Sequence, residues 1–458
     1  MALSSGIEIQ AGEEGGVMLV PRIPSFLRGS NSNDHYNPKV VSLGPYHHGK
    51  PELQRLEEFK PKVFDHFISQ SRMDNATFYW KKVLGRVDDL RRCYDEGSTD
   101  EFDNFRFAEM MLLDSCFLLC YMVPDDFWLF QLIGASFFFF IQRDLFLFEN
   151  QIPLWIVEFL YNDIVTKVSW KHLLVGHCQR NLYGDEYRVD DDMDRDAKPL
   201  HLLQAFHTLM VCKSHTTPTV TPSTHSIRRC CTNFMRTHQN CTIIPIGRCC
   251  PNFMPTDKNN TTIKVQKDSF EKYGYVFRSV MDLKAKGIHF GHSDNIYSVT
   301  SIKFESSNYA YAKLKLPIWY ASPLSKVFFT NMLAYEICSN DISLEIIAYV
   351  NFMKSLIVCP NDVKELREKR IISNTLGDDM EVVQLFKGLN THGIDDPEIF
   401  REVKQKIQQH YDSKANTWMA ELVYTYLRSP WTIIALLAAC LLLLLTLAQT
   451  YVAFNPRN

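Results

Sequence analysis

The sequence predicts a mainly helical (α+β) domain that contains a small β element and is followed by one C-terminal transmembrane helix. Three observations lead to this fold class. Apolar residues recur at three-and-four spacing along much of the chain, two short segments alternate apolar and polar residues, and one long run near the C-terminus carries no charge. With 458 residues, 46% of them hydrophobic, the chain can bury a substantial core as two or three domains or as one large one.

Residues 21–211 are expected to form the N-terminal helical part of this domain, and a turn-rich segment at 22–49 opens it. The residues from Ser98 to Glu101 have the spacing of a capping box and are expected to open the third helix. The four phenylalanines Phe137–Phe140 could indicate another membrane span, but charged residues follow too soon. Five helices are predicted, at 51–70, 78–94, 105–122, 137–148 and 154–161.

Residues 268–428 are expected to form the C-terminal part of the domain. Two segments in it, 297–304 and 312–316, alternate apolar and polar residues and predict a small hairpin or sheet. Helices are predicted on both sides of this β element, at 269–286, 326–337, 342–357, 361–369, 380–389 and 397–424.

Between these two parts lies a segment, 212–267, that is rich in Thr, Ser, Pro, Cys and Asn and is expected to have little order. It contains an internal repeat: residues 229–242 are echoed 19 positions later, with nine of fourteen residues identical. Two copies are too few for a solenoid, so a local duplication within a surface loop is the simplest interpretation.

The segment from Trp431 to Tyr451 has no charged residue, and its centre, which includes Leu441 and Leu445, is a run of thirteen apolar residues. Twenty-one residues of helix rise ~30 Å, the thickness of the hydrocarbon layer. The two terminal aromatic residues stand where interfacial aromatics are expected. A buried core helix is the alternative, but the run leaves no polar face. We therefore predict a single membrane anchor at 431–451.

The cytosolic side of the membrane is predicted for the main domain. Residues 1–20, a flexible lead, have no basic region and no apolar stretch of signal-peptide length. Seven residues follow the anchor, which favours insertion as a tail anchor. The 13 cysteines, an odd number spread over a long chain, favour a reducing compartment. Glycosylation would favour the opposite side, and the candidate triplets begin at Asn75, Asn240, Asn259 and Asn260.

The sequence contains no Gly-x-x-x-x-Gly-Lys-Ser/Thr loop, no Gly-x-Gly-x-x-Gly, no Gly-x-Ser-x-Gly and no His-Glu-x-x-His motif. The formal net charge of -3 and the pI of about 6.6 do not indicate nucleic-acid binding. We therefore predict no catalytic residue, no cofactor and no small-molecule substrate.

Three clusters contain residue types that bind metals, but none is predicted to be a metal site. In the repeat, five cysteines accompany His238 without any Cys-x-x-Cys pair, and the duplication alone explains their clustering, although stoichiometric zinc would overturn this interpretation. The adjacent pair His47–His48 is interpreted as part of a capped turn. The group His289–Asp294 is interpreted as a turn before the predicted strand. The five cysteines are Cys230, Cys231, Cys241, Cys249 and Cys250.

Four polar side chains stand inside or between strongly apolar stretches, namely Asp114, Glu149, Asn150 and Gln151. Because buried polar groups must be hydrogen-bonded, we expect them to tie helix ends together or to pair with a basic residue such as Arg143 or Arg22. The alternative is a general acid with a raised pKa. The sequence places no nucleophile beside these residues, so the structural interpretation is preferred.

A series of motifs follows a fixed order along most of the chain. They are Arg22-Ile23-Pro24, Tyr36-Asn37-Pro38, Ser42-Leu43-Gly44-Pro45-Tyr46-His47-His48-Gly49, Met111-Leu112-Leu113-Asp114-Ser115-Cys116-Phe117, Arg143-Asp144-Leu145, Glu149-Asn150-Gln151-Ile152-Pro153, Asn331-Met332-Leu333-Ala334-Tyr335-Glu336, Asp362-Val363-Lys364-Glu365-Leu366, Pro430-Trp431 and Gln449-Thr450. This set resembles a plant family catalogued as domain of unknown function 247. The resemblance runs from about residue 21 to 454 and leaves out the segment 212–267.

The resemblance implies a single-pass membrane protein with a largely helical domain and with no established catalytic residues. Some relatives are associated with self-incompatibility recognition in grasses, which points to partner binding or signalling and suggests the plasma membrane. The expected partners are therefore the lipid bilayer, through 431–451, and a protein that the sequence does not identify, while nucleic acid is not expected. The alternative function is a membrane-tethered hydrolase or transferase that uses Asp114 and Glu149.

Overall fold

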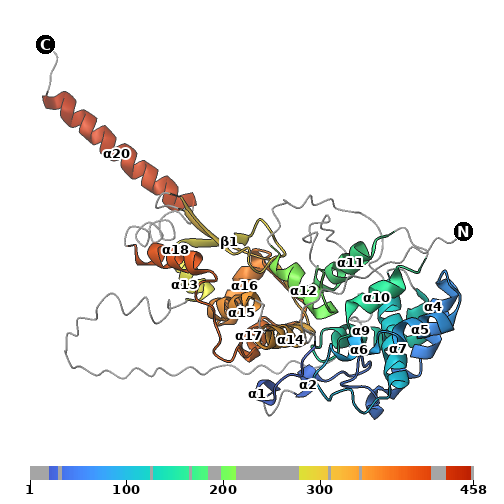
Figure 1. The fold of residues 1–458 in the computed structure, drawn as a ribbon. Helices are drawn as coiled ribbons and strands as arrows, with labels where there is room; N and C mark the ends of the chain where they lie inside the picture. Colours follow the sequence, from blue (N-terminus) through green and yellow to red (C-terminus); the bar gives the residue numbers. More distant parts are fainter. Residues whose placement is uncertain are drawn as a thin grey trace, which may run out of the picture. The chain divides into compact units, whose positions relative to one another are not determined.

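The computed structural model describes residues 20–28, 33–123, 127–164, 168–183, 198–212, 278–307, 311–339, 343–413 and 430–454. Within these ranges the chain is mainly helical and contains two small sheets, which confirms the predicted fold class (Figure 1). The duplicated segment, with its five cysteines and His238, lies outside the described residues.

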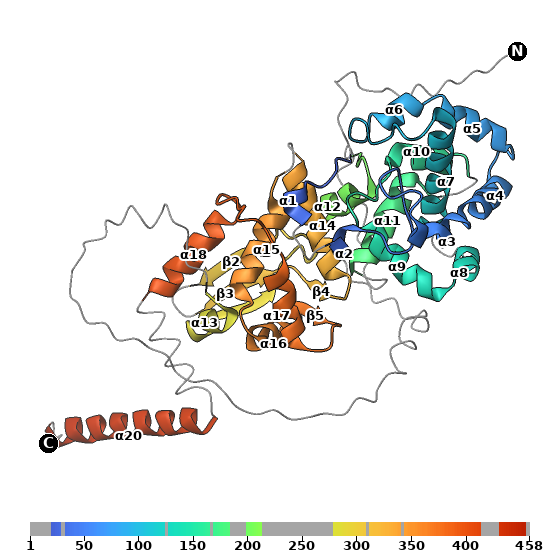
Figure 2. The same cartoon turned by 90° about the horizontal axis from the view of Figure 1, so that it is seen from below.

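The N-terminal helices pack around α7 (Asn104–Met122), whose side chains are almost all buried from Phe107 onward. Helices α4, α5 and α10 contact it directly (Figure 2). The other elements of this part are α1 (Ser25–Arg28), α2 (Asn33–Tyr36), η1 (Pro51–Leu53), α3 (Gln54–Glu57), α4 (Lys60–Gln70), α5 (Ala76–Leu84), α6 (Val87–Arg91), α8 (Phe127–Ile133), α9 (Ala135–Leu145), α10 (Leu154–Tyr161) and α11 (Trp170–Tyr183).

Two of the predicted helices are broken in the structure. The helix predicted at 51–70 is divided into η1, α3 and α4, because Pro61 has no N–H to donate to the preceding turn. The helix predicted at 78–94 ends at Gly85 and resumes as α6. The prediction of a capping box at Ser98–Glu101 was also wrong. Asp103 caps α7 instead, and its side chain accepts the N–H of Arg106 at 2.8 Å.

The C-terminal part is built around α14, which packs on α2 and α15, and around α16, which packs on α13 and α17. The predicted helices at 326–337, 342–357, 361–369 and 380–389 are all present with shifted ends, whereas the one predicted at 397–424 is described only from 401 to 412. Helix α12 (Leu202–Val211) contacts α11 and ends the N-terminal part. The helices of the C-terminal part are α13 (Val280–Ala285), α14 (Ser325–Cys338), α15 (Glu345–Leu356), α16 (Pro360–Glu368), α17 (Asp379–Gly388) and α18 (Arg401–Asp412).

The larger sheet has three strands in the order β1-β3-β2, with β1 (Ile288–His292) parallel and β2 (Lys303–Ser307) antiparallel to the central β3 (Tyr311–Leu316). Buried Leu314 lies between Phe290 and Phe304, and α13 and α18 contact the two outer strands. A second sheet pairs β4 (Trp319–Ala321) with β5 (Ile372–Asn374) in parallel. The predicted hairpin is thus present as β2 and β3.

Two local predictions near this sheet were wrong. The segment 297–302 does not form a strand, because the side chain of Asn295 accepts the N–H groups of Tyr297 and Ser298 and directs the backbone into turns. The segment around His289, predicted to be a turn, forms β1, whose pairing with a distant strand leaves little local signal in the sequence.

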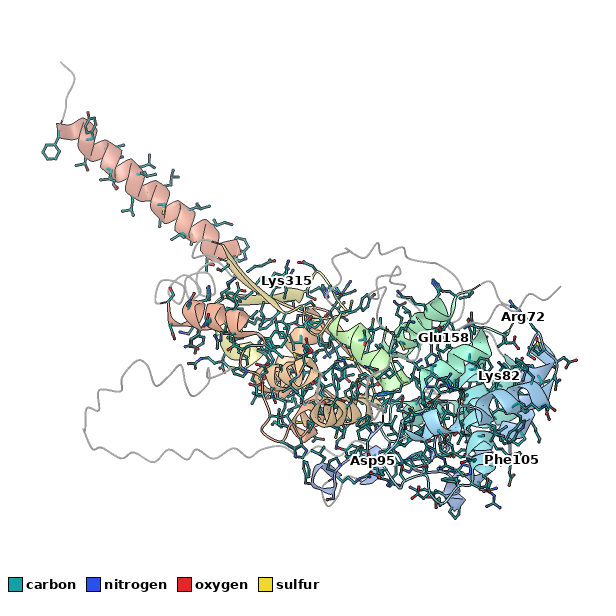
Figure 3. All side chains as sticks on the ribbon, in the orientation of Figure 1. Arg72, Lys82, Asp95, Phe105, Glu158 and Lys315 are labelled. Carbon is teal, nitrogen blue, oxygen red and sulfur yellow. The ribbon has the colours of Figure 1, made fainter. Side chains whose placement is uncertain are left out.

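Helix α20 (Pro430–Phe454) is long and apolar enough to cross a membrane. Its segment Ile434–Tyr451 has a mean hydropathy of 2.1, and none of it is buried. Apolar side chains project from every side of this helix (Figure 3). The side chains of Leu441 and Leu445 are more than half exposed, and those of Trp431 and Tyr451 still more so. A helix with apolar side chains on all sides is unfavourable in water, so α20 requires an apolar environment.

Candidate functional site

The polar residues that interrupt apolar sequence gather around the described residues of 20–50, which we call the N-terminal arm. The arm contains the short helices α1 and α2 but is otherwise irregular, so many of its N–H groups have no partner in a helix or strand. Buried N–H groups of this kind need acceptors. Side chains from α7, α9 and the loop after α9 supply them.

Asp114 and Lys60 form a buried ion pair between α7 and α4. Lys60 Nζ lies 2.5 Å from Asp114 Oδ1, 2.5 Å from Glu57 Oε1 and 2.8 Å from the carbonyl oxygen of Ser42. The second oxygen of Asp114 accepts the N–H of Gly44 at 2.7 Å. Burial alone would lower the pKa of Lys60, but the carboxylates of Asp114 and Glu57 hold that pKa above its usual value, so the lysine stays charged.

Position 44 requires glycine for two reasons, its backbone conformation and the lack of space for a side chain. Its φ is +74°, a region that L side chains rarely adopt. A Cβ at this position would lie 2.8 Å from the hydroxyl oxygen of Tyr94 and 3.0 Å from the carbonyl oxygen of Gln151. The arm therefore approaches α7 closely enough for Asp114 to bind its backbone.

Asp144 and Asn150 hold the next stretch of the arm. The Asp144 carboxylate accepts the N–H groups of residues 39–41 at 2.8–3.1 Å, and Arg143 donates to it at 2.7 Å. The side-chain oxygen of Asn150 accepts the N–H of Leu43 at 2.8 Å, and its nitrogen donates to the carbonyl oxygen of Asp144 at 3.0 Å. These side chains supply hydrogen-bond partners to an irregular segment that has none in a helix or strand.

Glu149 holds the beginning of the arm. Its carboxylate accepts the N–H of Ile23 at 2.6 Å and pairs with the guanidinium of Arg28. His47 Nε2 lies 3.8 Å away. Burial lowers the pKa of His47 to about 3, and the nearby positive charges of Lys50 and Arg28 act in the same direction. His47 is therefore neutral beside this ion pair at physiological pH.

The basic partners differ from those expected. Asp114 pairs with Lys60 and Glu149 with Arg28, whereas Arg143 pairs with its neighbour Asp144. The guanidinium of Arg22, the other expected partner, lies 4.5 Å from the ring centroid of Tyr46. Lys60 was not identified because it takes a core-facing position in an otherwise ordinary helical pattern.

Gln151 joins the loop after α9 to α12, and Asn331 joins that loop and the arm to α14 in the C-terminal part. Gln151 donates to the carbonyl oxygens of Leu145 and Leu147, both at 2.8 Å, and its oxygen accepts the N–H of Leu203 in α12 at 3.0 Å. Asn331, on α14, accepts the N–H of Phe148 at 2.9 Å and donates to the carbonyl oxygen of His35 at 2.8 Å. Sequence alone gave Asn331 no role, since its partners lie far away along the chain.

Glu336 caps α15 and approaches two other potential metal ligands. Its oxygens accept the N–H groups of Ile346 and Ile347, each at 2.8 Å, and Oε1 lies 2.8 Å from His207 Nε2. Metal-ligating atoms of His207, Glu336 and Glu345 lie within 4.8 Å of one another. A cation here would face the positive end of α15 and compete with the N–H groups that Glu336 already binds. Helix capping accounts for this cluster.

The first histidine motif forms a turn beside Glu149, and the second lies on and just after strand β1. Tyr46 to Gly49 forms a turn that ends in a glycine with a φ of +77°. His289 is exposed on β1. Asp294 pairs with Lys303 and Lys315 at 3.1 and 3.0 Å.

The arrangement as a whole fixes backbone in place. The side chains of Asp114 and Glu149 are each 1% exposed, and their oxygens are bound to N–H groups and cations of the protein itself. A carboxylate in such surroundings has no oxygen turned toward a substrate. The geometry supports a structural role for both acids.

The fold and this network define a class of protein: a mainly helical domain, organised around a buried polar network, whose chain continues into one C-terminal apolar helix. The chain belongs to the plant protein family of unknown function DUF247, whose sequence profile matches residues 20–445. The match confirms the resemblance noted from the motifs.

Two similar proteins come from Arabidopsis thaliana. UPF0481 protein At3g47200 is 26% identical over 91% of this chain and 82% of its own length. Putative UPF0481 protein At3g02645 is 22% identical over 94% of this chain and 89% of its own length. No solved structure matches this chain significantly.

Proposed function

We propose that this chain is a single-pass membrane protein whose helical domain binds a protein partner and catalyses no reaction. The observation that carries the proposal is α20, whose apolar side chains are exposed all around. A bilayer supplies the apolar surrounding that the described part of the domain does not. The lack of catalytic motifs and the structural role of Asp114 and Glu149 support the non-enzymatic part of the proposal.

Alkaline extraction of microsomes tests the anchor. The chain is expected to stay in the membrane pellet, and the variant Leu441→Arg/Leu445→Arg is expected to move to the supernatant, since each arginine at the helix centre opposes insertion by about 2.5–3.5 kcal/mol. The matched control, Leu441→Ile/Leu445→Ile, keeps the apolar run and should remain in the pellet. Extraction of the wild-type chain with the soluble fraction would contradict the proposal.

Cross-linking in intact membranes, followed by purification of the tagged chain, tests the partner. A protein recovered in constant ratio to the chain, from wild type and from Leu441→Ile/Leu445→Ile alike, is the expected result. Loss of that protein with Leu441→Arg/Leu445→Arg would show that partner binding depends on the membrane. Failure to recover any stoichiometric protein would count against an interaction role.

A further inference from the structure

Helices α8 and α9 carry an uncharged aromatic surface that the network around the N-terminal arm does not use. From Phe127 to Gln142 the sequence has no Asp, Glu, Lys or Arg. The side chains of Phe139 and Phe140 are 46% and 39% exposed, whereas Ile141 on the same helix is buried. The two helices lie side by side at the margin of the N-terminal helices (Figure 2).

One exposed cation, Arg55, borders this surface, and a second, Lys62, is exposed on α4. The guanidinium of Arg55 lies 4.6 Å from the ring centroid of Phe137, and the ammonium of Lys62 lies 5.2 Å from that of Phe59. Glu58 and Asp65 are exposed on the same segment, so the positive charge is local and not a broad basic face. Aromatic rings with cations at their edge match the interfacial layer of a bilayer, where rings meet acyl chains and cations meet phosphate.

Because α20 is proposed to cross a membrane, the bilayer is the nearest apolar partner for this surface. This step rests on the proposed function. Residues 414–429 connect Ser413, at the end of α18, to α20. At about 3.5 Å per residue, a chain of this length spans at most about 60 Å. A domain tethered so closely meets the bilayer at an effective concentration on the order of mM, at which even a weak surface is occupied.

We propose that the surface formed by Phe137–Phe140 of α9 and by the adjoining face of α8, here named the aromatic face, rests in the interfacial layer of the bilayer that α20 crosses. The acyl chains below the headgroups take up the exposed phenylalanine rings, and Arg55 lies at the level of the phosphates. The domain then has a fixed orientation on the membrane, and its other faces remain open to a protein partner.

Photo-cross-linking to lipid tests this proposal. The full-length chain is reconstituted in vesicles of phosphatidylcholine with a minor fraction of phosphatidylserine, some of whose acyl chains carry a diazirine, and adducts are mapped by mass spectrometry after irradiation. Adducts are expected in α20 and within 128–142. Phe139→Ser/Phe140→Ser is expected to reduce the second set at least fivefold and to leave the first unchanged. The matched control Phe105→Ser removes an aromatic ring that is 58% exposed on α7 and should change neither set (Figure 3).

The possible results separate the two proposals. Adducts in α20 but not within 128–142 would overturn the membrane contact and leave the anchor standing. The absence of adducts in α20 would overturn the proposed function itself. Self-association of the detergent-solubilised chain that disappears with Phe139→Ser/Phe140→Ser, without lipid adducts at 128–142, would assign the aromatic face to a second copy and contradict the proposal.

Discussion

At the scale of single residues, the buried ion pair of Lys60 and Asp114 shows how polar groups are used in this domain. Each is hydrogen-bonded to the arm as well as to the other, through the carbonyl oxygen of Ser42 and the N–H of Gly44. A buried pair of this kind adds little net stability compared with an apolar pair. Its consequence is positional, because it determines where the arm crosses α7.

Removal of one partner of this pair is expected to be severe. Lys60→Met leaves the Asp114 carboxylate buried beside Glu57, and we expect the free energy of unfolding to fall by about 3–5 kcal/mol. Adding Asp114→Asn should restore part of that loss, because the uncompensated charge is then gone. Urea unfolding followed by circular dichroism measures both. Lys303→Met, in an exposed pair with Asp294, serves as control and should change the value by less than about 1 kcal/mol.

The buried histidines predict how the stability of the domain depends on pH. Burial lowers the pKa values of His177 and His201 to about 3 from the usual 6.5, so the unfolded chain takes up protons below pH 6.5 that the folded chain does not. Stability therefore falls as pH decreases from about 6.5 toward 3, and at pH 5 each histidine accounts for about 2 kcal/mol.

The variant His201→Asn tests this linkage. His201 caps α12 by accepting the N–H of Gln204 at 3.2 Å, and asparagine keeps that acceptor but does not titrate. Urea midpoints measured between pH 7 and pH 5 should decline less steeply in this variant than in the wild type. An unchanged decline would show that His201 is not held neutral in the folded state.

At the scale of elements, the structure separates what local pattern can predict from what it cannot. Helices with a continuous apolar stripe, such as α7 and α10, were predicted nearly to the residue. Pro61 and Asp103 are sequence signals for a helix break and a helix cap. The regular spacing of the apolar residues around them was given more weight. Strand β1 had no such signal, because it pairs in parallel with β3, which lies further along the chain. The polar site was predicted by residue type, and its basic partners were missed because the fold, not the spacing, brings them together.

The N-terminal arm allows an element-scale test. Glu149→Ala removes the acceptor for Ile23 N–H and the partner of Arg28, so the beginning of the arm is expected to detach while α7 and α10 stay folded. Hydrogen exchange at residues 20–28 should become at least tenfold faster, with little change in α7. Glu58→Ala, at an exposed site nearby, is the matched control. Equal protection in Glu149→Ala and wild type would show that other contacts hold the arm.

At the scale of the whole molecule, most of the motifs noted in the sequence meet in the network just described. The arm supplies the first three motifs, and Asp114, Asp144 and Glu149–Gln151 come from the next three. Asn331 and Glu336 extend the network into the C-terminal part, where each stabilises the backbone of another segment. These motifs therefore contain residues that maintain the fold of this chain. Residues that recognise a partner are to be sought on exposed surfaces.

We propose that one helix, α20, crosses a membrane and that the domain lies on the cytosolic side, as the sequence predicts. Protease treatment of sealed microsomes, with their cytosolic face outward and with the chain tagged at both ends, tests it most directly. We predict that protease digests the domain and its N-terminal tag while the C-terminal tag is protected until detergent is added. A protected domain that also carries glycan at Asn75, or a C-terminal tag digested without detergent, would contradict the account.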